Sequence, residues 1–167
     1  MSKQHTDYYS HILGMSLPVE VTGHYGYPVI MFPTSQGNYT QNSDFLLTDS
    51  VKWLTDSGKI KIYNVQTIDN LSLYNKNIPP QERIRDYELF IQFLVKEYIP
   101  YIQKLHQTHR VAVAGASFGA YHAANFAFRF PDLVSHMISL SGAFSIRSFM
   151  DGYSDDLVYL NCPREQM

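Results

Sequence analysis

One short stretch of the chain carries the residues best able to do chemistry. Residues 111–120 read Val-Ala-Val-Ala-Gly-Ala-Ser-Phe-Gly-Ala, an apolar run that ends in Gly-x-Ser-x-Gly. A short continuous apolar run is typical of a buried parallel strand, and the alanine-rich segment after it is typical of a helix. A sharp turn between the two would hold Ser117 strained and exposed at the carboxyl edge of a sheet. The pattern therefore predicts a nucleophile elbow with Ser117 at its tip.

The two glycines of the pattern support this interpretation, because a side chain at Gly115 or Gly119 would crowd the neighbouring strand or helix. The alternative is a glycine-rich strand-to-helix turn whose serine has no catalytic role. A phosphate-binding loop is disfavoured, since no lysine follows the second glycine and the Walker spacing is absent.

The strands that must position Ser117 are indicated by hydrophobic periodicity. Residues 15–22 alternate between apolar and polar types, which predicts a half-buried strand, and Pro18 favours an edge or irregular position. Residues 29–32 indicate a buried strand after a turn at 23–26, so the two strands are expected to form an antiparallel hairpin. A further strand is expected over 60–65.

Helices are expected between these strands. An amphipathic pattern predicts a short helix over 44–55 and a long one that begins at Pro79-Pro80. Pro100 is expected to kink or restart the long helix. The small residues after Ser117 would let a third helix lie close to the sheet until Pro131 ends it.

The last third of the chain adds one more strand, at 134–140. Residues 143–167 are expected to be loop-like, with a short apolar element at 157–160. Strands that alternate with helices predict an α/β fold with a mostly parallel sheet.

Length and charge limit the classes of function. The chain has 167 residues, which fits one domain, and its 13 Lys and Arg against 15 Asp and Glu give a net charge of −2. Without a basic block, nucleic acid is not expected as a partner. Residues 2–7 lack the apolar core of a signal peptide, and no apolar run is long enough for a membrane span. Cys162 is the single cysteine, so an internal disulfide is excluded and a cytoplasmic location is expected.

Three segments, in this order, resemble the α/β-hydrolases and, more narrowly, the esterase family that includes esterase D-like enzymes. They are Pro-Val-Ile-Met-Phe-Pro-Thr-Ser-Gln-Gly at 28–37, Gly-Ala-Ser-Phe-Gly-Ala-Tyr-His-Ala-Ala-Asn at 115–125, and Phe-Pro-Asp-Leu-Val at 130–134 leading to Ser-Leu-Ser-Gly-Ala-Phe at 139–144. The resemblance implies an α/β-hydrolase-like, mostly parallel sheet flanked by helices and lacking its last strands. Residues 1–167 would then form a single, partial domain.

The resemblance also implies a serine ester hydrolase that acts on a small-molecule ester, and no cofactor is expected. No metal site is expected either, because no His, Asp or Glu cluster has ligand spacing. Ser117 would attack an acyl carbonyl and form an acyl-enzyme. The oxyanion would be held by the backbone N–H of Phe118 and by an N–H from the loop after the earlier strand. Ser35 and Gln36 both match that loop position.

The chain departs from the family pattern after Ser117. In this fold the triad acid and histidine follow the nucleophile, and in the family they lie after two further strands, before which this chain is expected to end. His122 is expected to be structural, because it lies on the helix that leaves the elbow. The remaining histidines lack the placement of a general base. Asp151, Asp155 and Asp156 are expected to form a solvated acidic loop.

Two other functions therefore stay open. The chain could be a non-catalytic hydrolase remnant that acts in assembly or binding, or it could transfer an acyl group to an acceptor other than water. A sheet without its last strands would expose the edge of the strand at 134–140, which predicts a homo-oligomer formed through that edge. The alternative is that residues 143–167 fold back over the edge, with 157–160 as a short substitute strand.

Overall fold

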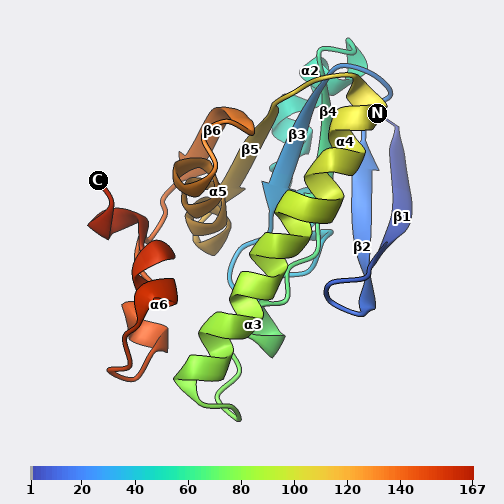
Figure 1. Cartoon of the computed structure of the whole chain (residues 1–167). Coiled ribbons are helices and arrows are strands. Elements are labelled where there is room, and N and C mark those ends of the chain that lie inside the picture. Colours follow the sequence, from blue (N-terminus) through green and yellow to red (C-terminus); the bar gives the residue numbers. More distant parts are fainter. Residues whose placement is uncertain (1) are drawn as a thin grey trace.

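A six-stranded sheet organises the described residues, 2–167, of the computed structural model (Figure 1). In chain order its strands are β1 (Lys3–Ser10), β2 (Met15–Thr22), β3 (Tyr27–Phe32), β4 (Ile60–Val65), β5 (Val111–Ala116) and β6 (Val134–Leu140). Across the sheet the order is β1-β2-β4-β3-β5-β6. The last four of these are mutually parallel, whereas β1 and β2 are added antiparallel. The predicted α/β fold with a mostly parallel sheet is confirmed.

The expected hairpin between the second and third strands is wrong. β4 lies between them and pairs with both, so that Tyr63 is opposite Val21 on one side and Ile30 on the other. The pattern also missed β1, whose side chains are mostly exposed and so carry little apolar signal. Because β1 pairs along the whole of β2, Pro18 lies in an inner strand, opposite Asp7, and not at the edge.

The helices are α1 (Gln41–Asp44), α2 (Lys52–Asp56), α3 (Pro80–Phe93), α4 (Ile99–His106), α5 (Phe118–Arg129) and α6 (Asp156–Leu160). Short 3₁₀ turns occur at Asp49–Val51, Asp69–Leu71, Arg147–Phe149 and Pro163–Glu165. The helix expected over 44–55 is therefore broken into pieces. A π-helical turn at Leu94–Tyr98 joins α3 to α4 just before Pro100, so the expected irregularity is present. Figure 1 shows α3 and α4 as one long rod across the sheet.

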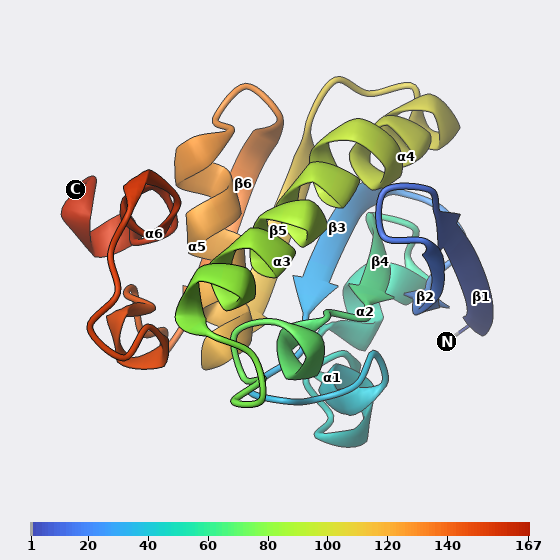
Figure 2. The ribbon, with the colours of Figure 1, turned by 60° about the horizontal axis from the view of Figure 1, so that its bottom comes forward.

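Two apolar layers cover the sheet. The main core lies between one face and the α3, α4 and α5 helices, where Ile30 and Val113 meet Tyr87 and Phe126. A smaller cluster around Met31 on the other face packs against the segment that carries α1 and α2. Figure 2 shows this segment on the opposite side of the sheet from α3. No helix among residues 2–167 combines the length and the apolar character that a bilayer crossing requires.

The tail after residue 143 is mostly irregular with one short helix over 156–160, as expected, and it packs into the core. Ile146, Met150, Val158 and Cys162 are fully buried in the main cluster. Residues 156–160 form a helix that packs against α3, so they do not supply a substitute strand beside β6. Within the described residues, β6 is an edge strand that pairs only with β5.

Asp151 and Asp156 are exposed, as expected of a solvated loop, but two acidic residues of this tail also have structural partners. Asp151 forms an ion pair of 2.9 Å with Arg83 of α3. Asp155 caps α6 by accepting a hydrogen bond of 2.8 Å from the Val158 N–H, and it also accepts one from the Tyr153 hydroxyl.

Candidate active site

Ser117 lies at the sharp turn between β5 and α5, with φ 55° and ψ −119°. Its N–H donates to the Leu140 carbonyl at the end of β6 (2.9 Å), and its carbonyl accepts from Ala120 and Tyr121 in the first turn of α5. A non-glycine residue in such a conformation costs of the order of 1–3 kcal/mol and persists because its surroundings hold it there. The side chain is exposed at the carboxyl edge of the sheet. The predicted strained strand-to-helix turn is therefore confirmed.

The two glycines around Ser117 are required by close backbone contacts. A Cβ at Gly115 would lie 2.2 Å from the carbonyl carbon and oxygen of Gly119, where β5 passes under α5. A Cβ at Gly119 would lie 2.4 Å from the Phe32 carbonyl oxygen and 2.7 Å from that of Pro33. The second contact brings the loop after β3 directly against the first turn of α5.

This loop forms a tight turn that leaves two amides free. The Gly37 N–H donates to the Thr34 carbonyl, which places Ser35 and Gln36 at the exposed tip, the latter at φ 55°. The Thr34 N–H and hydroxyl both donate to the Gln41 side chain, at 2.7 and 2.6 Å. The N–H groups of Ser35 and Gln36 have no hydrogen-bond partner among residues 2–167. Both amides therefore lie on the loop beside α5 without an internal acceptor.

Gln41 is a part of this site that the sequence did not indicate. Its side chain packs directly against Gly37, and a Cβ added to Gly37 would lie 1.8 Å from the Gln41 Oε1. Gln41 thus fixes the loop through two bonds to Thr34, and the absence of a side chain at Gly37 makes room for it. A glutamine seven residues from its partner, in a polar loop, has no distinguishing signal in one sequence.

The first turn of α5 supplies further free amides. Phe118 is the first helical residue, and the first four N–H groups of a helix have no acceptor within it. The N–H groups of Ala120 and Tyr121 are used by the Ser117 carbonyl. The Phe118 N–H, directly after the serine, remains available to a negatively charged oxygen at the helix start.

His122 lies in the core with both ring nitrogens occupied. It is 1% exposed, and its Nδ1 and Nε2 are each 3.0 Å from a partner, the Tyr87 hydroxyl and the Asp69 carboxylate respectively. The Asp69 carboxylate accepts from Nε2–H, and burial raises the pKa of Tyr87, so that the Tyr87 hydroxyl stays protonated beside Nδ1. His122 therefore packs as predicted and ties the loop after β4 to α5. Its ring nitrogens are not free to accept the serine proton.

The partners of His122 could not be found from the sequence. Asp69 and Tyr87 are 53 and 35 residues away from it, and neither belongs to a motif. The network continues through Asn125, which donates to the Tyr87 hydroxyl (3.3 Å) and to the Asn161 side chain (2.8 Å). A polar cluster inside the main core therefore joins α3, α5 and the end of α6.

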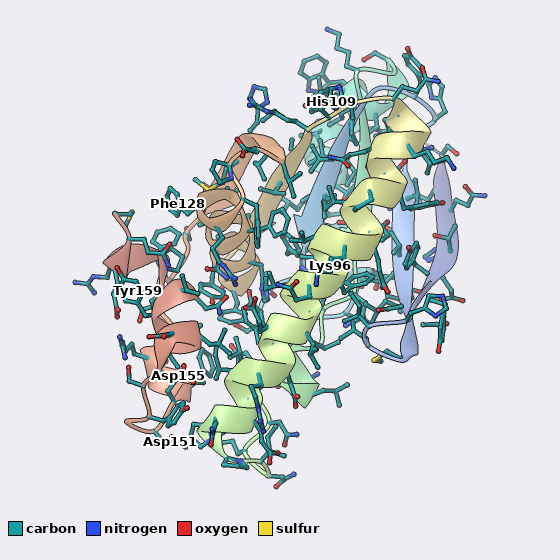
Figure 3. All side chains as sticks on the ribbon, viewed as in Figure 1. Lys96, His109, Phe128, Asp151, Asp155 and Tyr159 are labelled. Carbon is teal, nitrogen blue, oxygen red and sulfur yellow. The ribbon has the colours of Figure 1, made fainter. Side chains whose placement is uncertain are left out.

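The other histidines lie away from the elbow. His136 is opposite Ala112 at the start of β5, and His106 ends α4, both near the amino ends of the parallel strands. Figure 3 labels His109 at this same end of the molecule. The hydroxyl of Ser117 has no hydrogen bond to any residue of the 2–167 range. Within that range, no three His, Cys, Asp or Glu side chains gather as metal ligands would.

Comparison with known proteins places the chain among esterases. A family model described as "Putative esterase" matches residues 11–160. A search of curated protein sequences found no match.

Several solved structures that superpose on the chain are described as hydrolases or esterases. The S-formylglutathione hydrolase of Staphylococcus aureus superposes with a TM-score of 0.67 at 14% identity, over 98% of this chain and 68% of that chain. The fluorophosphonate-binding serine hydrolase F of the same organism gives 0.67 at 17%, over 98% and 71%. A ferulic acid esterase gives 0.70 at 16%, over 99% and 70%. At these identities the likeness shows the fold, which is of the α/β-hydrolase type.

Proposed function

Because the chain belongs to the Putative esterase family, we propose that it is a serine ester hydrolase with Ser117 as its nucleophile. The observation that carries this proposal is the strained, exposed backbone position of Ser117 between β5 and α5. Such a turn presents a serine Oγ to a substrate above the sheet edge. Ser141 also has φ 55° and is exposed, but it follows the edge strand β6 and does not precede a helix.

In the proposed reaction, the Ser117 Oγ attacks the acyl carbon of a small-molecule ester. A bond forms between Oγ and carbon, the alcohol leaves with the serine proton, and water later releases the acid from the acyl-enzyme. The Phe118 N–H and the N–H of Ser35 or Gln36 would hold the oxyanion of each tetrahedral intermediate. The support for these donors is that all three amides lack an internal acceptor and that the two segments meet at Gly119.

We propose further that the described residues do not supply the triad acid and histidine. Both nitrogens of His122 are engaged, and no other imidazole of residues 2–167 bonds to Ser117. Without a base the serine hydroxyl stays protonated at neutral pH, and attack is slow. Removal of a triad member typically leaves about 10³–10⁴-fold catalysis over water, from the oxyanion hole and substrate binding.

A non-catalytic role in binding or assembly is the second candidate. The absence of a base next to Ser117 and the unpaired edge of β6 favour it. Acyl transfer would use the same residues, with another acceptor in place of water.

Turnover of p-nitrophenyl acetate by the 167-residue chain tests these proposals. We expect slow release of p-nitrophenol that Ser117→Ala abolishes and the matched variant Ser141→Ala retains. Release that survives Ser117→Ala would contradict the assignment of the nucleophile. Fast turnover that depends on Ser117 would show that a base is present after all. No release above buffer would favour the non-catalytic role.

A further inference from the structure

A large cavity lies at the other end of the sheet, away from Ser117. Its volume is about 620 Å³, and its walls are the turn between β2 and β3, the start of β4 and the end of α4. We call it the amino-end cavity, because β3 and β4 both begin there. None of its lining residues belongs to the elbow or to the loop after β3.

The lining of the amino-end cavity is positively charged and has no compensating acid. Lys59 and Lys61 contribute two ammonium groups, His24 and His106 contribute imidazoles, and no aspartate or glutamate lines the cavity. Neither lysine forms an ion pair with another residue of the described part of the chain, whereas Lys3 and Lys52 do. In a chain with a net charge of −2, this end carries a local excess of unpaired positive charge.

Lys59 directly precedes β4, and Lys61 is the second residue of that strand. The Lys59 Nζ lies 5.3 Å from the centre of the Trp53 ring of α2, whereas Lys61 lies on the same face of β4 as Tyr63. The Lys61 Nζ lies 5.7 Å from the centre of the Tyr63 ring. Lys61 is half-buried, so its charge is less well solvated than that of an exposed lysine.

Hydrogen bonds and close backbone contacts hold the walls of the cavity in place. The buried Tyr63 places its hydroxyl 2.6 Å from the His106 Nε2, which joins β4 to the end of α4. Gly26, at φ +117°, lies so close to the Lys59 backbone that a Cβ would be 2.4 Å from the Lys59 carbonyl carbon. The Tyr27 N–H also donates to the Lys59 carbonyl (2.9 Å). The backbone that carries the two lysines is therefore held before any ligand arrives.

From this arrangement we propose that the amino-end cavity binds a small phosphate-bearing anion. The two lysines that line the cavity supply its positive charge, and lysine binds phosphate as a point charge. Tyr25, which also lines the cavity, adds a hydroxyl group that can donate to a phosphate oxygen. A bound anion would remove the repulsion between two unpaired cations. This site is independent of ester hydrolysis at Ser117.

Thermal unfolding of the full chain with inorganic pyrophosphate tests the proposal, with sodium chloride adjusted to keep the ionic strength constant. We expect a saturable rise in Tm, because a ligand that binds the native state stabilises it. Lys61→Met and Lys59→Met should each weaken apparent affinity by roughly tenfold or more, since each removes a charge-assisted contact. Lys104→Met is the matched control, because Lys104 is exposed on α4 and does not line the cavity.

Two further comparisons make the outcome decisive. The Tm of each variant without ligand shows whether it folds, and Lys59→Met removes an exposed side chain, so at least one variant should remain native. Ser117→Ala should bind pyrophosphate like the wild type, which separates this test from that of the esterase proposal. The absence of a saturable shift, or equal shifts in all three lysine variants, would overturn the proposal.

Discussion

The backbone around Ser117 is held in place, and close contacts leave no room for side chains at the two neighbouring glycines. The serine keeps a positive φ because its N–H and carbonyl are bonded to β6 and α5, and the glycines on either side allow three backbone segments to meet. This part of the site could be predicted from the sequence, because the Gly-x-Ser-x-Gly spacing is local. The bracing of the loop by Gln41 and the burial of His122 against Asp69 depend on contacts that no local pattern specifies.

Substitution of Gly119 tests the steric limit directly. In an ordinary helix, Ala in place of Gly stabilises by about 1 kcal/mol. Here the new Cβ would meet the carbonyl oxygens of Phe32 and Pro33 at 2.4 and 2.7 Å, and backbone cannot move aside cheaply. We expect Gly119→Ala to lower the free energy of unfolding by about 1–3 kcal/mol, measured by urea denaturation. An increase in stability would show that the loop after β3 is not held against α5.

At the scale of elements, a partly buried ion pair joins the helices of the main core. Arg129 of α5 donates to both carboxylate oxygens of Glu88 on α3, at 2.7 and 2.9 Å. Asn161, just after α6, also donates to Glu88 (3.2 Å). Burial alone would raise the pKa of Glu88, but the bonds and charge of Arg129 outweigh it, and the net shift is downward.

The lowered pKa of Glu88 predicts a pH-dependent stability. The contribution of this carboxylate is present above its ordinary value of 4.5 and is lost as the pH falls through the lowered pKa. Glu88→Gln should therefore lower the free energy of unfolding by about 2 kcal/mol at neutral pH and by much less in strong acid. Urea unfolding at both pH values measures this difference. Glu82→Gln on the same helix is the control, because Glu82 has no ion pair within residues 2–167. An equal loss of unfolding free energy for Glu88→Gln at both pH values would contradict a stabilising role of the ionised Glu88 carboxylate.

At the scale of the whole molecule, the β6 edge and the adjoining sheet face are apolar and little covered. Met137, Ile138 and Leu140 of β6 are exposed, and an apolar cavity of about 590 Å³ runs from them across the face around Met31. The tail leaves this edge open, since α6 packs against α3 on the other side of the sheet (Figure 1). Unpaired backbone groups next to exposed apolar side chains favour pairing with a second strand.

We therefore expect the chain to self-associate through β6 of two copies. Light scattering should give a mass above the 19.3 kDa of one chain. A lysine at Ile138 should shift the equilibrium toward the monomer, because a charge on an edge strand opposes pairing. Leu71→Lys is the matched control, since Leu71 is 54% exposed against 51% for Ile138 and lies in a 3₁₀ turn away from β6. A monodisperse monomer at high concentration would rule out this proposal.

How far the sequence predicts this architecture depends on how local each feature is. Strands β2 to β5 and the helices α3 and α5 follow from periodicity, because each buries one stripe or both faces. The apolar residues of β6 also indicate a strand, although its side chains are largely exposed. The pairing of β2 with β4 instead of β3 could not be predicted, since adjacent strands in sequence usually pair. The exposed edge strand β1 lacks a strong apolar pattern. The apolar run at 157–160 indicates a short element, but it is too short to distinguish the α6 helix from a strand.

Covalent labelling of the 167-residue chain with a fluorophosphonate tests the central proposal most directly. The serine Oγ would displace fluoride and form a bond to phosphorus, so the adduct reports nucleophilicity without requiring turnover. Peptide mass spectrometry should locate one adduct, on Ser117, even if prolonged incubation is needed. The adduct should be absent from Ser117→Ala and retained in Ser141→Ala. Labelling of another residue, or an unmodified Ser117 in a folded chain after prolonged exposure, would contradict the assignment of Ser117 as the nucleophile.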